Sequence, residues 1–234
     1  MLHCENLHIG YDQVLFSIDN LQLKKGELTS LIGPNGGGKT TFLQTLLGNN
    51  SPLNGAIYFQ GKPLSPTERK KWIANVPSKF NGVAHLSVYD YISLGRAPYT
   101  NFLHFLSNND KFIVEEAISL LGLKGIQHEA TDRISDGQRQ IASIALALVQ
   151  EKEVILLDEP TAFLDYSNRR KILHLLRELA IEKQKVILLS SHDLDLCLDF
   201  SHQLIAVDAT IKQLVTFPPQ IEKSSIVEQI FPMH

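Results

Sequence analysis

The stretch that decides the fold runs from Gly33 to Thr40 and reads Gly-Pro-Asn-Gly-Gly-Gly-Lys-Thr. An apolar strand pattern over 28–32 precedes it, and a helical pattern over 40–47 follows, with Gly48 as its stop. Glycines let consecutive backbone N–H groups turn toward an anion, and the start of a helix adds partial positive charge. The spacing G-x-x-x-x-G-K-[ST] in this context predicts a phosphate-binding loop.

Within this loop, Lys39 supplies a full positive charge for the β- and γ-phosphates of a nucleotide, and the Thr40 hydroxyl can ligate Mg²⁺. The alternative is a glycine-rich turn with an accidental Lys-Thr, for which four glycines, the lysine and both flanking elements must coincide. The residues expected to contact the nucleotide here are Gly33, Pro34, Asn35, Gly36, Gly37, Gly38, Lys39, Thr40 and Thr41.

A second candidate site follows the apolar run 154–157, which ends in Asp158 and Glu159. Carboxylates at the carboxyl end of a strand lie where open α/β sheets bind ligands. We expect Asp158 to hold Mg²⁺ through water and Glu159 to polarise the water that attacks a phosphate. Taken alone, the pair could be a solvated strand end, and the phosphate loop is what favours the catalytic reading.

Periodicity predicts an α/β protein whose sheet has a parallel part covered on both faces. Apolar strand-length runs at 186–189 and 204–207 alternate with a helical pattern at 168–182. Short strand-like runs occupy the first third of the chain, and 80–149 reads as mostly helical.

Composition excludes several classes of protein. The chain has 234 residues, enough for one large domain or two lobes. Its residues are 44% hydrophobic and 20% charged, which is ordinary for a globular protein. No apolar run approaches the roughly 18 residues of a membrane span, and the start has no signal-peptide pattern. A net charge of −3 argues against nucleic-acid binding, and two cysteines make no disulfide framework. We therefore expect a cytoplasmic protein.

The motifs together resemble those of the ATP-binding-cassette (ABC) ATPases over nearly the whole chain. The most specific element is Ile-Ser-Asp-Gly-Gln at 134–138, which resembles the family signature Leu-Ser-Gly-Gly-Gln. Ser135 precedes Asp158 by 23 residues, the spacing that such cassettes require. The resemblance implies ATP and Mg²⁺ as ligands and ATP hydrolysis as the activity. It also implies that the signature binds the ATP of a partner chain through Ser135, Asp136, Gly137 and Gln138.

Three further residues match family positions. Tyr11 resembles the aromatic residue that stacks on adenine, His192 the switch histidine that contacts the γ-phosphate, and Asp165 an acidic residue for communication across a dimer. Each has a simpler reading, because Tyr11 could lie on a sheet surface and a lone histidine is often structural. Ser135 is also a good helix N-cap.

The chain departs from the family pattern at two places near the site. Ser78 stands where the family usually has a glutamine that reaches Mg²⁺, so its metal contact is weak at best. Asp136 replaces a signature glycine and brings negative charge to a helix start, which Arg139 could offset.

The resemblance implies a P-loop NTPase fold of the ABC nucleotide-binding type, with a mixed, mainly parallel sheet core, an N-terminal antiparallel β lobe and an inserted α-helical lobe. The implied division is a catalytic lobe at 1–78, a helical signature lobe at 79–150, and the rest of the catalytic lobe with a short tail at 151–234. Since one chain holds one phosphate loop and one signature, a second copy is expected to complete a head-to-tail dimer with ATP between the chains.

The run Leu-Gly-Arg-Ala-Pro-Tyr at 94–99 resembles importer ATPases for iron–siderophore, haem and cobalamin complexes. This implies permease subunits in the membrane, an extracytoplasmic substrate-binding protein as an indirect partner, and a place on the inner face of the cell membrane. We expect residues 79–99 to receive a coupling helix of the permease, with charge reversal of Arg96 as a test.

Two alternatives stay open at this stage. A soluble non-transport ABC ATPase, such as an iron–sulfur assembly ATPase, is compatible with the length, whereas the 96 residues between Lys39 and Ser135 leave no room for the long coiled coil of repair-type proteins. An inactive ATP-binding module is disfavoured by the presence of Glu159 and His192.

Overall fold

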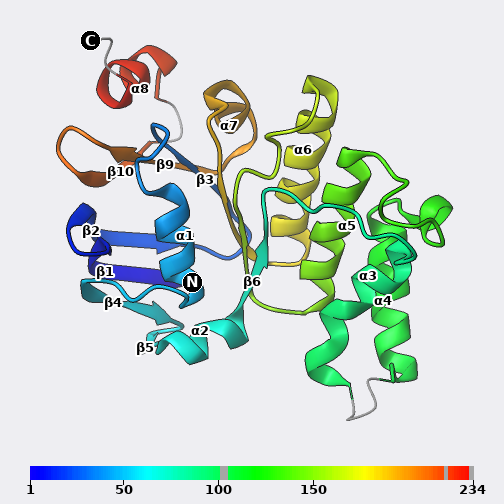
Figure 1. Ribbon diagram of the computed structural model, residues 1–234. Coiled ribbons are helices and arrows are strands. Elements are labelled where there is room, and N and C mark those ends of the chain that lie inside the picture. The colour runs from blue at the N-terminus through cyan, green and yellow to red at the C-terminus, as the bar shows by residue number, and fades with distance from the viewer. Residues whose placement is uncertain (101–104, 219–220, 232–234) are drawn as a thin grey trace.

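The computed structural model describes residues 1–100, 105–218 and 221–231, and a ten-stranded sheet runs through these residues in the order β5-β4-β1-β2-β10-β9-β3-β8-β7-β6 (Figure 1). The strands are β1 (Leu2–Gly10), β2 (Val14–Leu23), β3 (Leu28–Ile32), β4 (Asn54–Phe59), β5 (Lys62–Pro63), β6 (Ile73–Val76), β7 (Val154–Leu157), β8 (Val186–Ser190), β9 (Gln203–Asp208) and β10 (Gln213–Phe217).

The sheet has an antiparallel part and a parallel part. Strands β5, β4, β1 and β2 are antiparallel, whereas β9, β3, β8, β7 and β6 are parallel. The two parts meet at β10, which pairs antiparallel with β9 and parallel with β2 through Gln213 and Ser17. This mixed sheet confirms the expected fold class.

Helices cover both parts of the sheet. Figure 1 shows α1 beside β1 and β2, and α3, α4 and α5 gathered on the other side of β6. Within the described ranges, no helix is both long and apolar enough to cross a bilayer. The helices are α1 (Lys39–Leu47), α2 (Pro66–Trp72), α3 (Val88–Ser93), α4 (Asn108–Leu120), α5 (Asp136–Val149), α6 (Tyr166–Glu182), α7 (Leu194–Phe200) and α8 (Lys223–Ile230), with 3₁₀ segments η1 (Leu94–Tyr99) and η2 (Lys124–Ile126).

The buried core explains why the parallel strands are apolar without alternation. Every residue of β7 and β8 is buried, because helices pack on both faces. One apolar cluster fills the space between β1, β2, β4 and α1, and a larger one joins the parallel strands to α3, α4, α5 and α6. This core fixes the carboxyl ends of β3, β7 and β8 at one edge, where the candidate site lies.

Candidate functional site

The phosphate loop ends in a helix start that has no side-chain cap. Helices α2 to α7 all begin with a serine or aspartate whose side chain accepts a backbone N–H bond. Helix α1 instead begins at Gly38, which has a left-handed φ of 94° and offers no such bond. The first N–H groups of a helix have no partner within it, so the start of α1 can bind an anion through them.

Gly38 is also required by close packing beneath the loop. A Cβ atom at this position would lie 3.0 Å from Cε1 of Phe16 and 3.2 Å from Cδ1 of Leu15, at a φ that side chains disfavour. Both residues belong to β2, so the β1–β2 hairpin supports the loop from below. A larger residue at Gly38 would move the loop away from a bound phosphate.

Lys39 lies over the loop rather than in solvent. Its Nζ donates to the backbone oxygens of Gly33 at 2.8 Å and Pro34 at 3.0 Å, and the residue is 6% exposed. Burial lowers the pKa of this ammonium, while Glu159 and Asp158 act in the opposite direction. The cavity beside it measures about 180 Å³ and is lined by Asn35, Gly36, Gly38, Lys39, Thr40, Thr41 and Glu159.

Asp158 is held by hydroxyl groups from two other elements. Thr40 Oγ1, at the start of α1, donates to Oδ2 at 2.9 Å, and Ser190 Oγ, at the end of β8, donates to Oδ1 at 2.6 Å. A hydroxyl beside a carboxylate is a hard-oxygen donor pair, which suits Mg²⁺ when nucleotide phosphates complete its shell. No cluster of three or more His, Cys, Asp or Glu side chains that could hold a metal occurs among the described residues. A metal here would therefore depend on the nucleotide.

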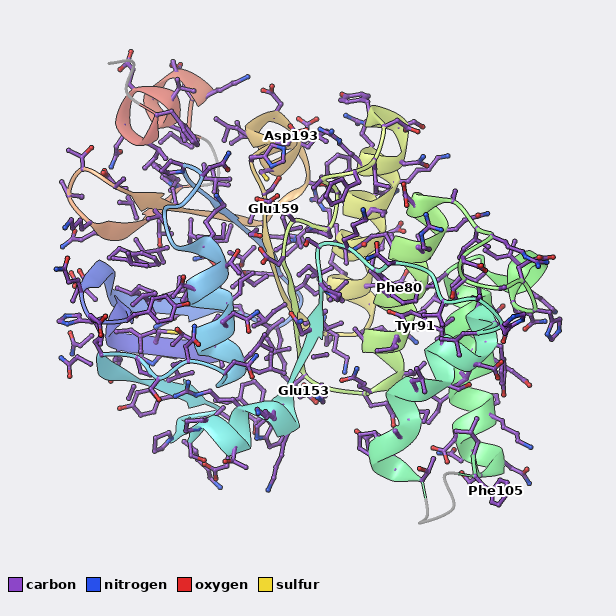
Figure 2. All side chains as sticks on the ribbon, viewed as in Figure 1. Phe80, Tyr91, Phe105, Glu153, Glu159 and Asp193 are labelled. Carbon is purple, nitrogen blue, oxygen red and sulfur yellow. The ribbon has the colours of Figure 1, made fainter. Side chains whose placement is uncertain are left out.

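Glu159 turns its side chain toward the same edge of the sheet. It has a left-handed φ of 45°, which is unusual for a residue with a side chain, and its N–H donates to Ser190 Oγ at 2.9 Å. Its Oε2 lies 3.7 Å from Nδ1 of His192, which is half exposed. Glu159 lines the same cavity as Lys39 and Thr40 at the start of α1, and Figure 2 labels it near the middle of the molecule. The side chains of Glu159 and His192 can therefore act on one bound group.

The sequence patterns did not assign a role to Ser190, yet its hydroxyl joins both carboxylate residues. Ser190 is completely buried. Strands β7 and β8 are parallel with Leu157 opposite Leu189, so the residues that follow are neighbours. The available signal was a polar residue directly after the apolar run 186–189.

The signature residues lie at the start of α5, away from the phosphate loop of their own chain (Figure 1). Ser135 caps the helix by accepting from the N–H of Gln138, and Oε1 of Gln138 accepts from the N–H of Ser135 at 2.9 Å. Asp136 is paired with Arg139, whose guanidinium lowers the pKa of that carboxyl. Gly137 lies in this first turn, where a Cβ atom would be 3.6 Å from the Asn168 side chain.

The remaining predicted residues occupy three separate places. Tyr11 follows β1 in the hairpin turn, is 63% exposed and accepts from Nδ2 of Asn50 at 3.3 Å. Asp165 caps α6 by accepting from the N–H of Asn168 at 2.9 Å. Ser78 is half-buried in the segment that follows β6.

Arg96 lies in the interior, whereas the charge-reversal test assumes that it lies at the surface. Arg96 is 3% exposed and lies inside the helical region, where it bonds Asp110 at 2.9 Å, Glu151 at 2.7 Å and the backbone oxygen of Val149 at 2.7 Å. Reversing its charge would test folding rather than contact with a permease. The buried position reflects a guanidinium surrounded by acceptors, which the linear sequence does not reveal.

Comparison with known proteins agrees with this geometry. Residues 16–162 match the family model described as ABC transporter. The chain is 36% identical to the probable siderophore transport system ATP-binding protein YusV of Bacillus subtilis, over 98% of this chain and 85% of that protein. It is 35% identical to the iron(3+)-hydroxamate import ATP-binding protein FhuC of the same organism, over 98% and 87%.

A solved structure is similar over most of both chains. It comes from a metal-chelate type ABC transporter in an inward-facing conformation, with 28% identity and a TM-score of 0.86, covering 98% of this chain and 88% of that one. The predicted family is thus confirmed by sequence and by fold. The chain belongs to the ABC transporter family, and it is one of the family's ATP-binding, ATP-hydrolysing subunits.

Proposed function

We propose that this chain powers a bacterial importer of an iron–siderophore complex or a related metal chelate, such as haem or cobalamin. The observation that carries the proposal is the joint arrangement of the loop, Asp158 and Glu159 at one edge, in a chain whose relatives are importer subunits. Those relatives favour import over the iron–sulfur assembly alternative.

ATP would bind with its phosphates over the start of α1. The unpaired N–H groups of the helix and the Lys39 ammonium provide positive charge there. Lys39 would exchange its backbone acceptors for phosphate oxygens. Thr40 and Asp158 are the residues that would hold Mg²⁺, which when bound neutralises charge on the β- and γ-phosphates. Tyr11 is exposed and can stack on adenine.

Glu159 would orient and polarise the attacking water, since its carboxylate faces the cavity beside Lys39. His192, 3.7 Å from that carboxylate, would contact the γ-phosphate. The Ser190 hydroxyl bonds both the Glu159 backbone N–H and the Asp158 carboxylate. It would therefore keep the general base at a constant distance from the carboxylate that holds Mg²⁺.

The working unit would be a pair of these chains arranged head to tail. The signature at the start of α5 lies apart from the phosphate loop of the same chain, so Ser135, Asp136, Gly137 and Gln138 are proposed to contact the ATP held by the other copy (Figure 1). Asp165, between the catalytic carboxylates and α6, would carry contacts across the dimer. ATP binding would close the pair and hydrolysis would open it.

The membrane-spanning part of the importer would be made of separate permease subunits, contacted by the segment 79–99, with a substrate-binding protein outside the cell. The chain would then lie on the inner face of the cell membrane. The proposed lobes, 1–78 with 151–234 and 79–150, would move relative to each other during this coupling.

Replacing Ser190 by alanine is expected to lower the ATP turnover number about tenfold, since the variant leaves the Glu159 N–H and one Asp158 oxygen without a partner. Steady-state ATPase assays measure this. Ser30→Ala is the matched control, because Ser30 is also fully buried but its hydroxyl bonds Ser201 at 2.6 Å. Equal turnover in both variants would contradict the role of Ser190.

Uptake of chelated iron tests the transport proposal. Deleting the gene in its source organism is expected to abolish uptake of radiolabelled iron given as a siderophore complex, with haem and cobalamin as parallel cargoes. The wild-type chain should restore uptake and the Lys39→Ala chain should not. Normal uptake of all three cargoes, together with a loss of iron–sulfur enzyme activity, would instead support the assembly alternative.

A further inference from the structure

A small pocket lies where three segments of the chain meet. Its volume is about 70 Å³, room for a few water molecules. One wall comes from the segment after β6, one from the first turns of α5, and one from the loop after β7. The lining residues are Ser78, Lys79, Phe80, Asp136, Arg139, Gln140, Pro160, Phe163 and Leu164.

Gln140, one of the lining residues, carries an unusual buried group. The residue is 5% exposed, and among the described residues its Nε2 has no hydrogen-bond partner. Buried donors without partners are rare in native proteins and call for an explanation. An amide nitrogen carries two donor hydrogens, so a partner that arrives in another conformation would be bound firmly.

The other walls connect the pocket to the catalytic carboxylates. Ser78 is two residues from Val76, whose backbone oxygen accepts from the N–H of Asp158 at 3.1 Å. Pro160 directly follows Glu159. Gln140 sits on the helix that Ser135 begins, so it moves with the signature. A bond across the pocket would therefore link the signature helix to the catalytic edge.

Two contacts made by lining residues would permit a small rotation of the walls. Phe80 stacks on Tyr91 of α3 with ring centres 4.1 Å apart, and Figure 2 shows the two rings together. The Lys79 ammonium lies 5.2 Å from the ring centre of Phe163, which is 60% exposed. These contacts involve flat rings and a flexible side chain, which can slide without breaking.

We propose that Gln140 is a positioning residue for ATP hydrolysis, whose amide donates to the Ser78 hydroxyl when the ATP-bound pair closes. This rests on the proposed head-to-tail dimer. The hydroxyl oxygen of Ser78 has two lone pairs, so it can accept a hydrogen bond regardless of which group its own hydrogen is donated to. Besides Ser78, Asp136 is the lining residue whose side chain could accept from Gln140. It lies one turn away on the same helix and is paired with Arg139, so a bond to it would not connect two segments.

In this proposal the Gln140–Ser78 hydrogen bond is absent before the pair closes and present afterwards. Loss of the bond should therefore affect turnover and not the stability of the nucleotide-free chain. Gln140→Leu should leave the melting temperature of the nucleotide-free chain equal or higher, because an unpaired donor is removed from the interior. The turnover number should fall about five- to tenfold, because one hydrogen bond made only in the closed state is lost. The KM for ATP should stay within about twofold of the wild-type value, because that bond is absent when ATP first binds. Melting curves and steady-state kinetics measure both.

Ser78 variants identify the partner. Ser78→Ala should lower turnover as much as Gln140→Leu, the double variant should be no slower than either, and Ser78→Thr should retain turnover because it keeps the hydroxyl. Gln150→Leu, at the other end of the same helix, is the matched control and should behave as wild type.

Four results would overturn the proposal. Three are wild-type turnover in Gln140→Leu, a melting temperature that falls together with turnover, and additive effects of Gln140→Leu and Ser78→Ala. The fourth is that Asp136→Asn abolishes the effect of Gln140→Leu, because the amide would then bind within its own helix. A wild-type chain without ATP turnover would be a failure of the proposed function instead, and it is seen before any variant is made.

Discussion

Replacing Glu159 by glutamine is expected to reduce ATP turnover by a factor of about 100 or more, the usual contribution of a general base. The amide has the size of the carboxylate but does not polarise water in the same way. The Lys39 contacts, the start of α1 and the Thr40–Asp158 bond are untouched. ATP binding should therefore persist.

This separation of binding from hydrolysis makes the variant a probe of assembly. With ATP retained between a phosphate loop and a signature, Glu159→Gln should elute as a dimer in size-exclusion chromatography with ATP, and as a smaller species without it. Lys39→Ala should lose both turnover and the ATP-dependent dimer, because the charge that faces the phosphates is gone.

Glu153→Gln is a matched control for Glu159→Gln. Glu153 precedes β7, whereas Glu159 follows it, and Figure 2 shows the two at opposite ends of the sheet. Glu153 pairs with Lys25 at 2.5 Å. Turnover close to wild type is expected for this control. Undiminished turnover in Glu159→Gln would show that another group activates the water.

The sequence could predict the phosphate loop and the carboxylate pair because both are local. Each is a short run beside an apolar strand, and neighbours along the chain carry the chemistry. Ser190 is different, since its bond to Asp158 spans 32 residues and depends on the register of β7 against β8. The pairing of β10 with β2, which makes one sheet of two parts, is likewise set by tertiary contacts.

Several elements escaped prediction for identifiable reasons. Helix α2 carries a clear signal, a capping box between Ser65 and Glu68 with proline at the first position, but its seven residues show no apolar stripe. Strand β6 has four residues, one of them the exposed Asn75, and is recognised only through its pairing with β7. Short elements depend on their neighbours more than on their own pattern.

The run 94–99, which suggested an importer, also has a structural role. A Cβ at Gly95 would lie 2.5 Å from the backbone oxygen of Leu146, so this glycine lets η1 approach α5 closely. Tyr99 donates to the backbone oxygen of Gln150 at 2.7 Å, and the Arg96 guanidinium lies 4.0 Å from the Tyr99 ring centre. These contacts hold η1 against the C-terminal part of α5.

Arg96→Met is therefore expected to destabilise the chain by about 3–5 kcal/mol, the usual cost of removing one partner of a buried ion pair. Asp110 is 4% exposed and would keep its charge without its cation. For a chain of this size the loss corresponds to a melting temperature lower by about 10 °C. Calorimetry or circular dichroism at neutral pH measures the change.

The dependence on pH follows from Asp110. In the folded chain the Ser107 hydroxyl, and then Arg96, hold the pKa of Asp110 below its usual value. The stability that this carboxylate contributes is present above its unfolded pKa of about 3.9 and is lost as pH falls through the lower folded pKa. In Arg96→Met the carboxylate has lost its cation, so protonation relieves a buried charge. The difference in the free energy of unfolding between Arg96→Met and the wild type should therefore become smaller at acidic pH.

Arg170→Met provides the matched comparison, because Arg170 also pairs with an aspartate, at 3.2 Å, but with a half-exposed side chain. Its loss should lower the melting temperature far less than Arg96→Met does, because exposed ion pairs contribute little to stability. Adding Asp110→Asn to Arg96→Met should recover part of the lost stability, since the buried charge is removed and the amide oxygen can still accept from Ser107. If Arg96→Met is no less stable than Arg170→Met, the ion pair does not hold η1, α4 and α5 together.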